Sequence, residues 1–144
     1  MIYLCDIDGT VADCQHRIHF IKEKDWRGFF AAVGGDSPIW PVIQTIKLLK
    51  AAGATIIMMS GRSDECLQET TMWLQRWEIP FDELYMRRAG DHRPDNIAKE
   101  SMLARVGQKW DLNKVVAVFD DRQQVVDMYR EKGLKVFQVA KGDF

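Results

Sequence analysis

The sequence predicts an α/β fold: a Rossmann-like parallel five-stranded sheet with helices on both faces and a small helical cap inserted after the first strand. Short apolar segments alternate along the chain with segments of helical spacing, which is the order expected of parallel strands joined by helices. The apolar segments are continuously hydrophobic, as is typical of strands covered on both faces. Because 144 residues are enough for one domain, we expect a single domain at 1–144.

The amino-terminal part supplies the first strand and the cap. Residues 2–7 are short, apolar and rich in β-formers, and they run into the turn sequence Asp-Ile-Asp-Gly-Thr at 6–10. Residues at about 11–35 mix aromatic and charged side chains, and glycines followed by Pro38 break the chain after them. We expect this insert to form one or two short helices.

The rest of the chain alternates helices with strands. The expected helices lie at 42–52, about 64–77, 94–106 and 123–132, and the expected strands at 55–59, 83–86, 115–119 and 135–139. Local signals support the helix ends: Ser63 or Asp64 suits an N-cap, Pro94 suits a first turn, and Gly133 suits a C-cap. Polar residues follow several of the strands directly. Since ligands bind beyond the carboxyl ends of such strands, we expect the site at that edge of the sheet.

Composition and cysteine content limit the classes of protein to which this chain can belong. The net charge of -1 gives no global positive field for tight binding to a duplex. Cys5, Cys14 and Cys66 have no metal-ligand spacing, and their odd number does not suit a disulfide framework, so we expect reduced thiols. We find no secretory signal and no apolar run of the roughly 20 residues that span a bilayer, and we expect a cytoplasmic protein without a membrane partner.

Two pairs of aspartates are the main chemical signal. Asp6 and Asp8 lie two residues apart at the end of the first strand, and Asp120 and Asp121 directly follow another strand. Carboxylates held close together repel one another, and a divalent cation with a preference for oxygen ligands, such as Mg²⁺, relieves that repulsion. The alternative is that Asp8 and Gly9 merely form a turn, which becomes improbable once both pairs are considered together.

Two further features suit a bound phosphate. The Ser60-Gly61-Arg62 sequence ends a strand just before a helix, where a hydroxyl and free backbone N–H groups hold an anion. Lys99 lies early in a helix that follows a Gly/Pro loop. By itself, a Ser-Gly sequence is commonly an ordinary loop, and a lysine on a helix is commonly a solvated surface group. These two features therefore indicate a phosphate site only in combination with the aspartate pairs.

Taken together, these motifs resemble the four motifs of the haloacid dehalogenase-type (HAD) phosphatases, in the family's order and over nearly the whole chain. The resemblance implies that Asp6 is the nucleophile and Asp8 the general acid/base. It also implies that Ser60 and Lys99 hold the phosphoryl oxygens, with Thr10 and Gly61 in the substrate-binding loops. Magnesium would be bound by Asp6, the backbone carbonyl of Asp8, Asp120 and Asp121.

The carboxyl-terminal part resembles a narrower group, the 3′-phosphatase domain of phage-type polynucleotide kinases. The resemblance rests on the Asp-Asp-Arg-x-Gln-Val-Val sequence at 120–126, the Gln-Val-Ala-x-Gly-Asp-Phe sequence at 138–144, residues 90–95 leading to Lys99, and Arg17. It implies a 3′-phosphatase acting in nucleic-acid repair on nucleic-acid ends or nucleotides. The chain has no P-loop, so any kinase or ligase would be a separate partner. The oligomeric state is left open.

The substrate leaves alternatives open. The insert does not follow the phage-type group closely, and a 5′-mononucleotidase, a small sugar-phosphate phosphatase and a non-catalytic phosphate-binding module are the competing interpretations. The complete set of catalytic motifs argues against the last, because a simple binder does not need Asp8. His16, His19 and Trp26 either line the site or pack within the insert.

Arginines at strand ends and in loops favour a nucleic-acid substrate. Guanidinium groups bind phosphate in a bidentate way, and one phosphate is already accounted for, so spare arginines suggest further phosphates or a base. The arginines assigned to substrate binding are Arg17, Arg62, Arg87, Arg93 and Arg122, and Arg88 lies beside them. The alternative for each is a pair with Asp64, Asp91 or Asp95 that braces the site.

Overall fold

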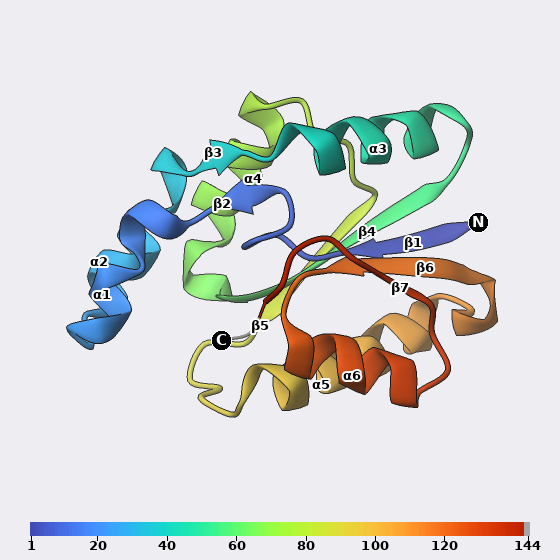
Figure 1. Ribbon diagram of the computed structural model, residues 1–144. Helices are drawn as coiled ribbons and strands as arrows, with labels where there is room; N and C mark the ends of the chain where they lie inside the picture. The colour runs from blue at the N-terminus through green and yellow to red at the C-terminus, as the bar shows by residue number, and fades with distance from the viewer. Residues whose placement is uncertain (143–144) are drawn as a thin grey trace.

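The computed structural model describes residues 1–142 (Figure 1). Asp143 and Phe144, which contribute to the resemblance above, lie outside the described residues. The central sheet has five strands in the order β5-β4-β1-β6-β7, and every neighbouring pair is parallel. These strands are β1 (Ile2–Cys5), β4 (Thr55–Ser63), β5 (Glu83–Arg87), β6 (Val115–Asp120) and β7 (Val136–Gln138). The predicted parallel sheet is confirmed.

Helices cover both faces of this sheet, as predicted. Figure 1 shows α3 (Trp40–Ala51) and α4 (Leu67–Arg76) on one face and α5 (Asp95–Lys109) and α6 (Gln123–Glu131) on the other. Single 3₁₀ turns, η3 (Asp64–Cys66) and η4 (Leu112–Lys114), precede α4 and β6. The side chain of Ser63 accepts a hydrogen bond from the N–H of Glu65 and so caps η3. None of the helices in the described part is long and apolar enough to cross a membrane.

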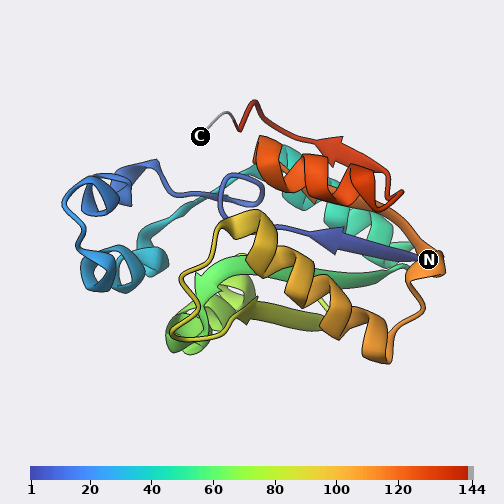
Figure 2. The ribbon, with the colours of Figure 1, turned by 90° about the horizontal axis from the view of Figure 1, so that it is seen from below.

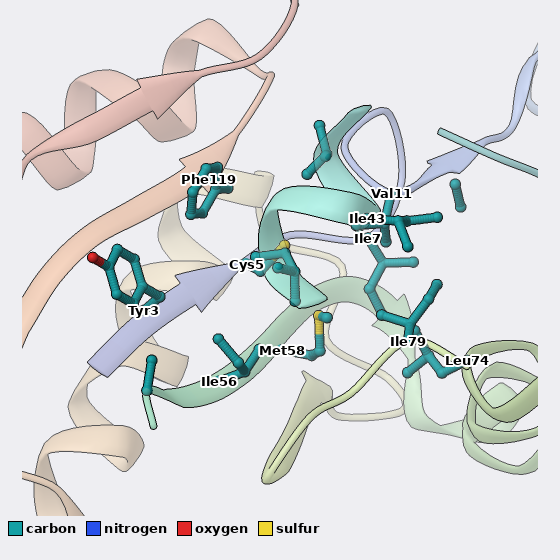
Figure 3. Close-up of a cluster of buried hydrophobic side chains, with 14 of the residues drawn as sticks. Tyr3, Cys5, Ile7, Val11, Ile43, Ile56, Met58, Leu74, Ile79 and Phe119 are labelled. Carbon is teal, nitrogen blue, oxygen red and sulfur yellow. The ribbon is translucent and has the colours of Figure 1, made fainter. Parts of the chain in front are cut away.

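The strands divide their side chains between two cores because successive residues of a strand point to opposite faces. The core on the α3/α4 face includes Tyr3, Cys5, Ile56, Met58 and Phe119. The core on the α5/α6 face includes Ile2, Leu4, Ile57, Met59 and Val118. Figure 3 shows the first core, where Ile43, Leu74 and Ile79 meet the strand residues. This alternation fixes which face each following polar side chain takes.

The insert lies between β1 and α3. It consists of β2 (Ala12–Asp13), η1 (Gln15–Arg17), α1 (His19–Lys22), α2 (Trp26–Ala31), η2 (Val33–Gly35) and β3 (Ser37–Pro38). β2 and β3 pair antiparallel and close its base, a pairing that was not expected because two-residue strands leave no hydrophobic pattern. In Figure 2 the helices α1 and α2 form a small lobe beyond the carboxyl ends of the strands. Its action as a cap over the site stays a prediction.

One strand end differs from the expectation in a way that matters for the site. β4 was predicted to end at residue 59, but it continues through Ser63. Ser60 is in register with Met86 and Ser63 with Arg87, so the pairing with β5 is irregular between Ser60 and Ser63. The Ser-Gly-Arg sequence is therefore an irregular end of the strand and not a free loop after it.

Candidate active site

The first cluster forms where β1, β6 and α5 meet. Asp6 follows Leu4 by two residues and Asp120 follows Val118 by two, so both carboxylates face the side of the sheet that carries α5. The ammonium of Lys99 on α5 lies 2.6 Å from Asp6 Oδ1 and 2.9 Å from Asp120 Oδ2. Three segments that are far apart in the sequence thus deliver three charged groups to one point.

This cluster is buried and carries an excess of negative charge. Asp6, Asp120, Asp121 and Lys99 are each at most 6% exposed. Burial and the neighbouring Asp120 raise the pKa of Asp6 well above its usual value, and they also raise the pKa of Asp121. Burial acts to lower the pKa of Lys99, but Asp120 and Asp6 outweigh it and raise that pKa. One ammonium does not balance three carboxylates.

The same three aspartates suit a metal ion. One carboxylate oxygen from each of Asp6, Asp120 and Asp121 lies within 4.8 Å of the other two. Hard divalent cations prefer oxygen ligands, and an added cation would lower the repulsion that raises the pKa of Asp6. The residues therefore fit a cation such as Mg²⁺. The side chain of Asp8 does not belong to this group, and its assignment as a ligand through its backbone carbonyl stays a prediction.

The turn after β1 holds the cluster in shape. The carbonyl of Ile7 accepts hydrogen bonds from the N–H groups of Thr10, Val11 and Ala12, at 2.9–3.1 Å. The hydroxyl of Thr10 lies 3.2 Å from Asp6 Oδ2 and 3.5 Å from Asp121 Oδ1. Gly9 has a φ of +80°, and a Cβ there would collide with the Asp121 carboxylate. Glycine is needed at this position for both reasons.

Asp8 lies in a second cluster beside the first. Its carboxylate accepts hydrogen bonds from Arg17 Nη2 at 2.6 Å and from Arg62 Nη2 at 2.7 Å. Both guanidinium groups are buried, with Arg17 at 0% and Arg62 at 1% exposure. Burial acts to raise the pKa of Asp8, but Arg62 and then Arg17 outweigh it and lower the pKa. The ionised form of Asp8 is favoured in this arrangement.

Asp36 completes the second cluster, and no signal in the sequence pointed to it. Its side chain is buried and accepts hydrogen bonds from Arg17 Nε and Nη2 and from Arg62 Nη2, each at 2.8 Å. His16 Nε2 lies 2.7 Å from the same carboxylate, and the indole N–H of Trp73 donates to the Asp36 backbone carbonyl at 2.8 Å. In the sequence Asp36 is one polar residue in a glycine- and proline-rich break, so it could not be distinguished from an ordinary loop residue.

Three other predicted residues, Gly61, Arg87 and Arg122, form the rim of the site together with Asp95. Ser60 is buried, and its hydroxyl accepts the N–H of Arg62 at 3.1 Å. Arg87 donates to the carbonyl of Gly61 at 2.9 Å and pairs with Asp95 at 3.0 Å. Arg122 Nη1 lies 3.6 Å from the same Asp95 carboxylate, and the backbone N–H of Arg122 donates to Asp120 Oδ1.

Three other predicted residues have partners outside the two clusters. Arg93 forms a bidentate pair with Asp91. Trp26 is 51% exposed and contacts Phe29 and Phe30, and His19 stacks on a neighbouring phenylalanine. The pairs with Asp91 and Asp95 correspond to the bracing alternative, and the substrate contacts of these arginines stay predictions.

Comparison with known proteins gives one family. The family model described as the polynucleotide kinase PNKP phosphatase domain matches residues 1–144. The chain is 34% identical over 142 residues to a protein of Autographa californica nuclear polyhedrosis virus that is named as a bifunctional polynucleotide kinase/RNA ligase. That match covers 96% of this chain and 19% of the viral protein.

Two solved structures are similar to this chain. The chain is similar to a chain in the structure of the Pnkp1/Rnl/Hen1 RNA repair complex, with a TM-score of 0.86 and 33% identity over 99% of this chain and 43% of that chain. A class C acid phosphatase from Bacillus anthracis matches with a TM-score of 0.72 and 17% identity, over 99% of this chain and 67% of that chain, which shows the shared fold. The chain spans less than half the length of the viral protein and of the matched chain in the RNA repair complex.

Proposed function

The chain belongs to the polynucleotide kinase PNKP phosphatase domain family of HAD-type phosphatases and is a phosphoric monoester hydrolase, and we propose that it removes 3′-phosphates from nucleic-acid ends or nucleotides. We further propose that the reaction passes through an aspartyl phosphate on Asp6 and depends on magnesium.

The observation that carries the proposal is the contact of Lys99 with both Asp6 and Asp120 in a buried site at the carboxyl ends of the strands. A phosphate dianion is repelled by a carboxylate nucleophile, so a positive charge beside the attacking oxygen is required. Lys99 supplies one such charge. Thr10 lies against the other oxygen of Asp6 and restricts its rotation, which orients the carboxylate for attack.

The proposed chemistry has two steps. In the first, a carboxylate oxygen of Asp6 bonds to phosphorus, the ester P–O bond breaks, and the leaving oxygen takes a proton from Asp8. In the second, Asp8 takes a proton from water, the water oxygen bonds to phosphorus, and the acyl phosphate bond breaks. Inorganic phosphate leaves, and Asp6 and Asp8 return to their starting states.

The arginines around Asp8 must serve both steps. Their contacts favour the ionised form of Asp8, which suits its role as a base. For its role as an acid, the substrate phosphate has to draw one guanidinium away from Asp8. Arg17 Nη1 is buried and has no hydrogen-bond partner among residues 1–142, so it would gain a partner if the insert moved to admit a phosphoryl oxygen. This supports the substrate contact expected of Arg17.

Asp6, Asp120, Asp121 and the backbone carbonyl of Asp8 would hold the magnesium ion. When bound, the ion supplies positive charge that offsets the repulsion between the phosphate and the aspartates. Ser60 and Lys99 would hold the phosphoryl oxygens, with Gly61 and Arg62 beside them.

Because the named relatives combine several nucleic-acid repair activities, we propose that a separate kinase or ligase works with this chain. Analytical gel filtration with such a partner tests this, and separate elution would count against it.

Phosphate release from matched oligonucleotides tests the substrate. Two oligonucleotides of one sequence, phosphorylated at either the 3′ or the 5′ end, are compared with nucleoside 3′- and 5′-monophosphates and a small sugar phosphate. We expect at least a tenfold preference for the 3′-phosphate, and activity that disappears in a chelator and returns with magnesium. A preference for the 5′-phosphate or for sugar phosphates would refute the substrate proposal.

The Asp6→Asn variant tests the mechanism, since an amide cannot act as the nucleophile. Turnover should fall below a few per cent of wild type. Asp127→Asn, an exposed aspartate of α6, is the control and should keep full activity. Activity of Asp6→Asn above that level, with deamidation excluded by mass spectrometry, would show that the covalent mechanism is wrong.

A further inference from the structure

A groove outside the catalytic clusters runs between α5, the edge strand β5 and the loop that joins them. Its volume is about 420 Å³, and its polar lining includes Arg87, Arg88, Arg93, Ser101, Arg105 and Gln108. Figure 2 shows α5 lying beside β5, with the connecting loop at the carboxyl end of the strand. Arg88, Arg93 and Gln108 are exposed, so the groove is open to solvent.

The groove is strongly basic. Four arginines line it against a single acidic residue, Asp91, whereas the whole chain has a net charge of -1. Arg93 is neutralised by Asp91, and Arg87 by Asp95. Neither Arg88 nor Arg105 forms an ion pair with any carboxylate of residues 1–142. Two uncompensated guanidinium groups in one groove favour an anionic occupant.

The side chain of Arg105 is held in one orientation by its neighbours. It is half-buried, its Nη2 lies 3.4 Å from the carbonyl oxygen of Met86, and its guanidinium lies 5.5 Å from the centre of the Tyr85 ring. These contacts orient the group without neutralising its charge. A guanidinium that is already oriented loses less entropy when it binds phosphate.

The groove begins at the catalytic rim and leads away from it. Arg87 contacts Gly61 and Asp95 at the rim and also lines the groove. Ser101, Arg105 and Gln108 recur every three or four residues and so share one side of α5. From Asp95 to Gln108 the helix rises by roughly 20 Å at about 1.5 Å per residue. An extended chain whose end occupies the catalytic clusters could continue along this path.

We propose that this groove binds the phosphodiester backbone of a single-stranded nucleic acid on the 5′ side of the nucleotide that carries the terminal phosphate. The proposal rests on the proposed function, which places the 3′ end of such a strand at Asp6. Arg88 and Arg105 bind the backbone phosphates, and Ser101 and Gln108, which lie on either side of Arg105 along α5, provide neutral hydrogen-bonding groups. The groove thus selects a polymer end over a mononucleotide. An acidic peptide is the competing occupant.

Binding of a fluorescent 3′-hydroxyl oligonucleotide of about ten nucleotides, measured by anisotropy, tests the groove separately from the chemistry. The Arg88→Ala/Arg105→Ala variant should bind at least tenfold more weakly than wild type. Its log–log salt slope should be shallower by about 1.4, which is about 0.7 for each lost contact. Arg76→Ala is the matched control, because Arg76 is exposed on α4 at the opposite face of the sheet, and it should bind as wild type does.

Turnover adds a second readout. The double variant should lose at least tenfold in kcat/KM on a 3′-phosphorylated oligonucleotide and stay within twofold of wild type on a nucleoside 3′-monophosphate. An equal loss on both substrates would overturn the proposal. If replacing Arg105 prevents folding, Arg88→Ala alone, at an exposed position, should still bind about threefold more weakly.

The outcomes separate this proposal from the proposed function. If wild type binds the oligonucleotide through these arginines but hydrolyses only small phosphates, the substrate proposal fails. Of the groove proposal, the binding of single-stranded nucleic acid then stands, and the placement of its end at Asp6 fails. If wild type does not bind the oligonucleotide, or binds a polyglutamate peptide in its place, the groove proposal fails. Unchanged binding and an unchanged salt slope in the double variant would overturn it as well.

Discussion

Asp36→Ala should be among the most destabilising substitutions in this protein. The Asp36 carboxylate accepts three hydrogen bonds from Arg17 and Arg62 at 2.8 Å, and both guanidinium groups are at most 1% exposed. In the native cluster two guanidinium groups face two carboxylates, Asp8 and Asp36. The substitution leaves both guanidinium groups with Asp8 alone. One positive charge is then buried without compensation.

The size of the effect follows from that charge count. Removing one partner of a buried ion pair costs about 3–5 kcal/mol, because the remaining charge is desolvated and unpaired. The total stability of a domain of this kind is only about 5–15 kcal/mol. At roughly 2–4 °C for each kcal/mol, the melting temperature should fall by roughly 6–20 °C. Asp36→Asn keeps the shape and one acceptor oxygen, and it should lose less.

Urea unfolding followed by tryptophan fluorescence measures the change in the free energy of unfolding. Asp127→Ala is the control: its carboxylate is exposed on α6 and accepts a hydrogen bond from Gln123, so its substitution should cost less than about 0.5 kcal/mol. A loss below about 1 kcal/mol for Asp36→Ala would refute the reasoning. It would mean that Arg17 and Arg62 reach water or another partner when Asp36 is absent.

Three further predictions concern the metal cluster and the surface. In a chelator at pH 7, Asp121→Asn should raise the melting temperature by a few degrees. Burial and Asp120 raise the pKa of Asp121, so its charged form destabilises the metal-free fold. An unchanged or lower melting temperature would contradict this. Gly9→Ala should lower the free energy of unfolding by at least about 1 kcal/mol, because Gly9 has a φ of +80°. The added Cβ would collide with the Asp121 carboxylate, so magnesium should no longer stabilise the variant in thermal unfolding. A variant that magnesium still stabilises would count against this prediction. Burial acts to raise the pKa of Asp82, but Lys50 and the N–H of Ile56 outweigh it and lower the pKa. Asp82→Asn should therefore lose at most about 1 kcal/mol above pH 4, and its difference from wild type in urea unfolding should shrink as the pH falls further; a difference independent of pH would exclude the ion pair as its cause.

The sequence by itself determined the sheet and the first cluster of charged side chains. Continuous apolar strands joined by helices allow few arrangements other than a parallel sheet, and the carboxyl ends of parallel strands share one edge. Residues placed directly after two such strands, such as Asp6 and Asp120, therefore had to meet. Lys99 was assigned to them by its place among the family motifs, and the structure brings it within hydrogen-bond distance of both.

Only the tertiary structure decided how the arginines are distributed. Arg17 and Arg62 share Asp8 and Asp36, whereas Arg93 turns outward to Asp91 and Arg105 stays without an acidic partner in the described part of the chain. Arginine has the same charge and shape in every one of these places, so residue type alone cannot separate them. The difference lies in how the insert folds back, since the pairing of β2 with β3 places Asp36 against segments that are remote from it in the sequence. Such contacts depend on the packing of whole elements, which no local pattern encodes.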